Sequence, residues 1–295
     1  MTAPEASADR ARILDRGYRA YEGPRSGIGG AVWSVARHSL RATLGLGRPA
    51  RHKIFPVASA AIAYVPALVF TGLAVLFDTD LVAEQILTSY SEYYGFIGSA
   101  IVVFSALVAP EVLVRDRRDG MLALYLSTPL TRSTYLAAKA LAVGLALAIV
   151  TLGPPLFLLV AFTVQGGGPD GVAAWASTAG RIVGSGLAVS AAYTAVSLAA
   201  SSLTDRRAFA SVGVILALLG SGAVSEALVA GAGLADAWRM IDLVNMPFEL
   251  VERIYGEAGG FPELSTASVV AANAGWTLVG LGTVWLRYRR VEAVR

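Results

Sequence analysis

The chain has 295 residues, of which 55% are hydrophobic and 15% charged, and its mean hydropathy is +0.60. Soluble domains are usually about 45–50% apolar, so this composition favours an integral membrane protein. There is no cysteine, and the two histidines, His38 and His52, precede the first apolar run. Disulfides, thiolate metal sites and cysteine nucleophiles are therefore excluded, and a membrane-embedded serine hydrolase or zinc protease lacks its imidazole.

The chain begins with a charged segment and a patterned one. Residues 1–25 form a cytoplasmic leader that suits either a short surface helix or a disordered segment, and both alternatives stay open. Residues 26–295 form one membrane domain, which opens with apolar positions at helical spacing opposite a cationic face. The apolar side holds Val32, Trp33, Ala36, Leu40, Thr43 and Leu44, and the cationic side holds Arg37, His38 and Arg41. Such a helix is expected to lie in the lipid headgroup plane.

Six segments are apolar and long enough to cross a ~30 Å hydrocarbon core as helices. They cover about residues 54–77, 93–114, 140–164, 182–203, 208–234 and 267–286. The third contains Gly153-Pro154-Pro155, which predicts a kink because proline cannot donate a backbone hydrogen bond. The fifth contains Gly220-Ser221-Gly222, at which we expect its helix to be interrupted.

Basic residues are unevenly placed along the chain, and short loops rich in Lys and Arg stay in the cytoplasm. With both termini cytoplasmic, 21 of the 24 basic and 9 of the 21 acidic residues lie inside. The inner segments then carry a net charge of +12 and the outer segments −9. We therefore expect a multi-pass protein of the plasma membrane whose basic residues lie in cytoplasmic segments near anionic lipid headgroups, with no nucleic-acid partner.

The longest outer segment, residues 236–268, separates the fifth span from the sixth. Its apolar residues recur at helical spacing, and a loop of this length without secondary structure would be unusual. We expect one or two short helices that cap the outer surface, broken at Pro247 and at Gly259-Gly260.

Residues 114–132, VRDRRDGMLALYLSTPLTR, place a charged run before Gly120 and an apolar patch after it. The patch consists of Met121, Leu122, Leu124, Tyr125 and Leu126. Exposed apolar surface of this kind is typical of an interface, so the pattern favours a docking partner. The alternative is that the patch lies flat on the lipid surface.

This stretch resembles the permease subunits of ABC transporters of the type-2 exporter class. The likeness is carried by Glu111 at the end of the second span, the arginines after it, Gly120-Met121-Leu122, Pro129-Leu130-Thr131-Arg132 and Lys139. The order of the predicted elements extends the likeness over most of the chain. One departure is Asp119, which stands where many members carry a basic residue.

The resemblance implies an all-α integral membrane protein with six transmembrane helices and cytoplasmic N- and C-termini. It further implies an N-terminal interfacial helix, an outer helical insertion between spans five and six, and a coupling helix that enters a groove of a separate ATPase. The residues expected to couple to the ATPase are Arg117, Arg118, Asp119, Gly120, Met121, Leu122, Tyr125 and Leu126. Glu111 is expected to pair with a nearby arginine such as Arg115, because an unpaired carboxylate at the membrane edge is poorly solvated.

The expected function is transport. Two permeases, as a homodimer or heterodimer, would export an apolar or amphipathic substrate such as a drug, lipid or peptide. The sequence contains no Walker A pattern, so two copies of a partner ATPase are expected to bind ATP and Mg, with no cofactor on this chain.

Few polar residues within the spans could contact a substrate. The candidates are Tyr193, Glu226 and Asn273, although Tyr193 could equally fill space and Glu226 could be an ordinary solvated side chain. A six-span enzyme is disfavoured because Glu111 and Glu226 are single carboxylates at opposite membrane edges. A scaffold or signalling subunit without net transport remains an open alternative.

Overall fold

The computed structural model describes residues 23, 26–47, 49–50, 53–77 and 89–290, so most of the expected leader lies outside the described residues. Every regular element in these ranges is helical. The elements are α1 (Gly27–Thr43), α2 (Ile54–Phe77), α4 (Tyr93–Arg118), α5 (Leu122–Leu126), α6 (Arg132–Thr151), α7 (Gly153–Val164), α8 (Gly171–Ser202), α9 (Arg207–Glu226), η2 (Ala227–Gly231), η3 (Asp236–Ile241), α10 (Met246–Tyr255) and α11 (Thr266–Arg289). Six stretches are long and apolar enough to cross a membrane, which confirms the six predicted spans. They are α2, α4, α6 with α7, α8, α9 with η2, and α11.

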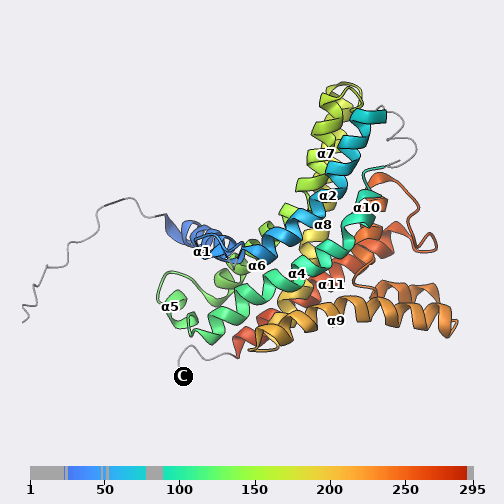
Figure 1. Ribbon diagram of the computed structural model, residues 1–295. Helices are drawn as coiled ribbons and strands as arrows, with labels where there is room; N and C mark the ends of the chain where they lie inside the picture. Colours follow the sequence, from blue (N-terminus) through green and yellow to red (C-terminus); the bar gives the residue numbers. More distant parts are fainter. Residues whose placement is uncertain (1–22, 24–25, 48, 51–52, 78–88, 291–295) are drawn as a thin grey trace, which may run out of the picture.

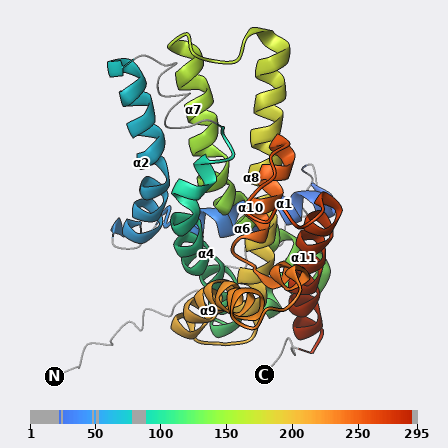
Figure 2. The ribbon, with the colours of Figure 1, turned by 90° about the vertical axis from the view of Figure 1, so that its right-hand side faces the viewer.

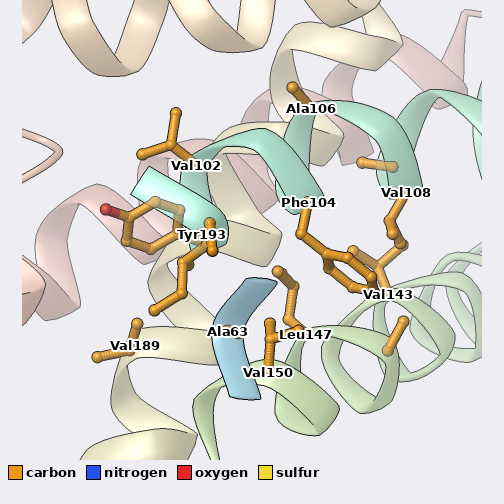
Figure 3. Packing of buried hydrophobic residues seen from close by; sticks show 14 of the residues in the cluster. Ala63, Val102, Phe104, Ala106, Val108, Val143, Leu147, Val150, Val189 and Tyr193 are labelled. Atoms are coloured by element: carbon orange, nitrogen blue, oxygen red, sulfur yellow. The ribbon is translucent and has the colours of Figure 1, made fainter. Parts of the chain in front are cut away.

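The core lies between α4, α6 and α8. Among the six membrane-crossing stretches α4 is the most buried, whereas α2, α9 and α11 leave most of their apolar surface exposed. Figure 3 shows Phe104 and Val108 of α4 close to Val143 and Leu147 of α6. In Figures 1 and 2, α2, α7 and the first part of α8 rise together, while α9 and α11 run through the lower part. The long helix α8 thus joins both parts of the bundle.

The kink predicted in the third span is confirmed. α6 ends at Thr151 and α7 begins at Gly153, with proline in the first turn of α7, where its missing N–H is not needed. Several boundaries differ from prediction, and the largest differences are at the starts of two helices. α6 begins at Arg132 rather than near residue 140, and α8 begins at Gly171 rather than near residue 182. Both extra lengths contain charged or polar residues, so hydropathy alone underestimates these helices.

The interruption expected at Gly220-Ser221-Gly222 is wrong. α9 continues to Glu226 and then into the π-helical turn η2. A Cβ added at Gly222 would lie 3.3 Å from Oδ1 of Asp242, and Ser221 Oγ accepts a hydrogen bond from the Leu243 N–H at 3.0 Å. The small residues therefore allow the segment around Asp242 to approach α9 closely instead of breaking the helix.

The segment between α9 and α11 is helical, as predicted, but its boundaries differ. Pro247 lies in the first turn of α10 instead of breaking a helix, and α10 ends at Tyr255, before Gly256, whose φ is +83°. Arg253 lies 2.6 Å from Glu249 and donates hydrogen bonds to the carbonyls of Phe261 and Leu264. These two hydrogen bonds hold the chain after α10 against the helix.

The helix predicted before the first span is present as α1. Its buried side chains, Ala36, Ser39 and Thr43, belong to the face that contacts α6. Trp33, which the pattern assigned to the apolar side, is exposed together with the cationic side chains. α1 therefore packs on the bundle through small residues, and its place in the headgroup plane stays a prediction.

Candidate coupling site at the end of α4

The charged run after the second span belongs to α4 and not to a loop. α4 continues through Arg118 and ends in a Schellman motif. Gly120 adopts a φ of +64°, the Met121 N–H donates to the Asp116 carbonyl at 2.9 Å, and the Gly120 N–H donates to the Arg117 carbonyl at 3.3 Å. Glycine is needed here because other residues rarely adopt this conformation. The turn leads directly into the short helix α5.

A buried cation joins this end of α4 to three other elements. Nζ of Lys139, a residue that is 2% exposed, lies 2.5 Å from Oδ2 of Asp116 and donates to Ser39 Oγ at 2.8 Å. The Tyr135 hydroxyl donates to the same Asp116 oxygen at 2.9 Å. The Tyr125 ring lies 5.0 Å from the ammonium group. We name these five residues, from α1, α4, α5 and α6, the Lys139 cluster.

The Lys139 cluster compensates a charge that would otherwise be costly to bury. An ammonium removed from water must be paired and hydrogen-bonded, and Asp116, Ser39 and two aromatic faces supply these contacts. Burial, with a further contribution from the Asp116 carboxylate, raises the pKa of Tyr125 to about 12. Near pH 7 Tyr125 is neutral, as it would be at its ordinary pKa, and it presents an uncharged ring to Lys139.

Arg117 makes a second connection, to the end of α8. Its guanidinium donates to the carbonyls of Ser201 at 2.7 Å and Ser202 at 2.5 Å, and also to that of Thr204. These carbonyls belong to the last turn of α8 and the residues after it, which lack intrahelical partners. The side chain is largely buried and lies over the Tyr288 ring of α11. Arg117 thus joins α4, α8 and α11, and this placement does not turn it toward a partner protein.

Glu111 forms the expected ion pair with Arg115 and a second, unexpected one with Arg207. Its carboxylate lies 3.4 Å from Arg115, within α4, and 2.8 Å from Arg207 at the start of α9. Arg115 also lies 3.3 Å from Asp119. Glu111 therefore links α4 to α9, while its part in coupling stays a prediction.

In the segment after α5, Thr131 and Arg132 stabilise the start of α6. Thr131 caps α6: its Oγ1 accepts from the Thr134 N–H at 3.3 Å, and Thr134 Oγ1 accepts from the Thr131 N–H at 2.8 Å. Arg132 donates to the carbonyl of Arg289 at 2.8 Å, at the end of α11. These contacts fix the start of α6 beside α11.

The orientation of α5 corrects the expectation for Leu122. Leu122 is 6% exposed and packs in the main core, and Tyr125 is half-buried in the Lys139 cluster. Leu124 is 60% exposed and is the large apolar side chain that α5 leaves uncovered. Of the other residues expected to couple, Arg118, Asp119 and Gly120 are exposed, and Met121 and Leu126 are half-buried. An ATPase that docks on α5 would meet Leu124 rather than Leu122.

Two of the three candidate pathway residues bind the same turn, and the third forms an ion pair elsewhere in the sequence. Tyr193 is fully buried and donates to the Val244 carbonyl at 3.2 Å, and Asn273 donates to the Met246 carbonyl at 2.8 Å. Both therefore hold the turn before α10. The side chain of Glu226 is 68% exposed and lies 3.6 Å from Arg239. The described residues contain no group of three or more histidine or acidic side chains placed to hold a metal ion.

Sequence reasoning missed Asp116, Ser39, Tyr135 and Arg207. One signal was available, because Lys139 stands beside a long apolar run and a charge there requires a partner. The sequence did not indicate which acidic residue is that partner. Asp116 and Asp119 both precede Lys139 in the same stretch, and only the three-dimensional packing of the helices shows that Asp116 is the one that pairs with it.

Comparison with known proteins agrees with this architecture. A family model described as ABC-2 family transporter protein matches residues 64–285, a range that begins within α2 and ends within α11. No curated protein matches the chain. The matched range covers more than half of the chain and includes parts of all six membrane-crossing stretches. The chain therefore belongs to the ABC-2 family of transporter proteins, as a multi-pass membrane permease.

Proposed function

We infer that this permease is the membrane half of an ABC exporter of the plasma membrane. Two permeases, identical or related, enclose the path, and two copies of a separate ATPase bind ATP and Mg and supply the energy. The observation that carries this proposal is the Lys139 cluster, which attaches α5 to the membrane-crossing helices.

The attachment gives α5 the properties that a coupling helix needs. One face is anchored by Leu122 in the core and by Tyr125 against Lys139, while Leu124 on the other face is free to enter a groove. A displacement applied to Leu124 would be passed to α4 and α6 together, because a satisfied polar network in a low-dielectric site resists rearrangement of single members. Arg117 would carry the same displacement to α8 and α11.

The surfaces of the outer helices of the bundle support the proposed substrate class. α2, α9 and α11 expose apolar side chains along their length, as with Val65 and Leu68 on α2, Leu216 on α9 and Leu278 on α11. A path enclosed between two copies of such faces suits an apolar or amphipathic molecule better than an ion. The proposed substrate is therefore a drug, a lipid or an apolar peptide.

Replacing Leu124 with aspartate tests the docking face. The charge should detach the ATPase without unfolding the permease, because the side chain makes little contact within the chain. Loss of a buried apolar anchor costs about 2 kcal/mol or more, roughly a 30-fold loss of affinity. The measurement is the amount of ATPase that co-purifies with the permease. Leu124→Met, which keeps the side chain apolar, is the matched control and should retain the ATPase.

Wild-type stoichiometry with Leu124→Asp would show that α5 rests on lipid, and the coupling assignment would be withdrawn.

Flux of an apolar dye in vesicles holding both subunits separates transport from a scaffold. ATP-dependent accumulation supports the exporter, whereas ATP hydrolysis without flux favours a signalling or structural subunit.

A further inference from the structure

A pocket of about 730 Å³ lies between α1 and the end of α4, beside α5. We name it the α1 pocket. α1 lines it with Trp33, Arg37 and Arg41, and Tyr125 and Lys139 of the Lys139 cluster also line it. The pocket therefore joins the exposed face of α1 to the buried polar contacts beneath α5.

Within the described part of the chain, the acidic side chains of the α1 pocket have ion-pair partners, whereas two of its arginines do not. Its three acidic side chains, Glu111, Asp116 and Asp119, each pair with a cation of α4, α6 or α9. Among the residues that the structure describes, Arg37 and Arg41 have no ion-pair partner, and both are exposed. They stand four residues apart on one helix face, an arrangement in which like charges repel. An anion between them would relieve this repulsion.

The α1 pocket also has apolar lining, which points to an amphiphile. Trp33 and Leu46 line it and are both exposed. A phosphate group would bind the guanidinium groups through charged hydrogen bonds, which arginine makes two at a time. A free phosphate ion would leave these two apolar side chains uncovered, whereas the chains of a lipid would cover them.

We propose that the α1 pocket binds the phosphate-bearing headgroup of an anionic lipid, held by Arg37 and Arg41. The lipid chains leave along Trp33 and Leu46. The headgroup then lies against Tyr125 and Lys139, so its presence changes how firmly α5 is held. That consequence for coupling rests on the proposed function, while the binding itself does not.

The test uses the purified full-length chain in nanodiscs that contain phosphatidylcholine and phosphatidylglycerol. Native mass spectrometry measures how much of each lipid the protein retains. Arg37→Gln with Arg41→Gln should weaken retention of phosphatidylglycerol at least about tenfold, because two charge-assisted contacts are lost. The matched control, Arg287→Gln with Arg290→Gln, removes the same charge from exposed positions at the end of α11, outside the pocket, and should retain the lipid.

Other outcomes would overturn the proposal. Equal loss in both double variants would assign the effect to diffuse surface charge, and unchanged retention in the α1 variant would leave the pocket without a lipid. Displacement of phosphatidylglycerol by inorganic phosphate at equal concentration would identify a free phosphate as the ligand. In a separate co-purification of the permease with its ATPase, an α1 variant that loses the ATPase although it keeps the lipid would identify the pocket as a protein-docking surface. The lipid measurement contains no ATPase, so a failure of the coupling function leaves its result unchanged.

Discussion

At the scale of single residues, the end of α4 is organised by ion pairs of unequal burial. The pair of Glu111 with Arg115 could be predicted from their spacing of four on one helix. The pair of Lys139 with Asp116 could not, because it depends on which turns of α4 and α6 face each other. Lys139 also donates a hydrogen bond to Ser39 of α1. These residues are a hundred positions apart, and no local pattern indicates the contact.

Lys139→Ala should be strongly destabilising, because it leaves the Asp116 carboxylate buried without its cation. Breaking a buried pair from one side costs about 3–5 kcal/mol, whereas replacing both partners with neutral residues costs much less. Lys139→Met combined with Asp116→Asn should therefore unfold at a higher temperature than Lys139→Ala. The check is thermal unfolding in detergent followed by circular dichroism. If the single and the double variant unfold at the same temperature, the ion pair contributes no net interaction.

At the scale of elements, the existence of the helices was predictable and their faces were not. The Gly153-Pro154-Pro155 break follows from proline chemistry, and the structure has it. For α5, five residues provide too few positions for a hydrophobic period, so the sequence indicated an apolar patch without showing that Leu122 points inward and Leu124 outward. At Gly220-Ser221-Gly222 small residues were interpreted as a break, although they serve the contact of α9 with Asp242.

Two glycines of α11 distinguish helix packing from helix flexibility. A Cβ at Gly280 would lie 2.8 Å from the backbone carbonyl of Ala195 in α8, while a Cβ at Gly282 would meet nothing within 4 Å. Gly280→Ala should destabilise the protein by about 1–3 kcal/mol, since backbone cannot move aside as a side chain can. Gly282→Ala should be neutral or stabilising by up to about 1 kcal/mol, because alanine favours a helix. Thermal unfolding of the two variants in the same detergent checks the difference, and a stable Gly280→Ala would contradict the close contact of α8 with α11.

At the scale of the whole molecule, hydropathy predicted six spans because a membrane requires about 20 apolar residues for each. It underestimated α4, α6 and α8, whose ends extend past the apolar runs with charged or polar residues that are anchored by other helices, as Arg117 is by α8. The sequence pattern did not predict which helices pack against one another. α8 packs against α4, α6 and α11, but its sequence shows stripes of small residues and no indication of which helices fill them.

Orientation in the membrane is the remaining property of the whole molecule, and the distribution of basic residues predicts it. The chain has no cysteine, so single cysteines at Arg118 and Asp170 provide unique labels, and both positions are exposed. The two positions lie on opposite ends of the bundle if the third span crosses the membrane once as α6 with α7. With the termini in the cytoplasm, an impermeant thiol reagent added to intact cells should label Asp170→Cys, and Arg118→Cys only after the membrane is opened. Labelling of Arg118→Cys from outside, with Asp170→Cys protected, would show that the topology is inverted. α5 would then lie on the face that no cytoplasmic ATPase can reach, and the proposed coupling function would be wrong as well.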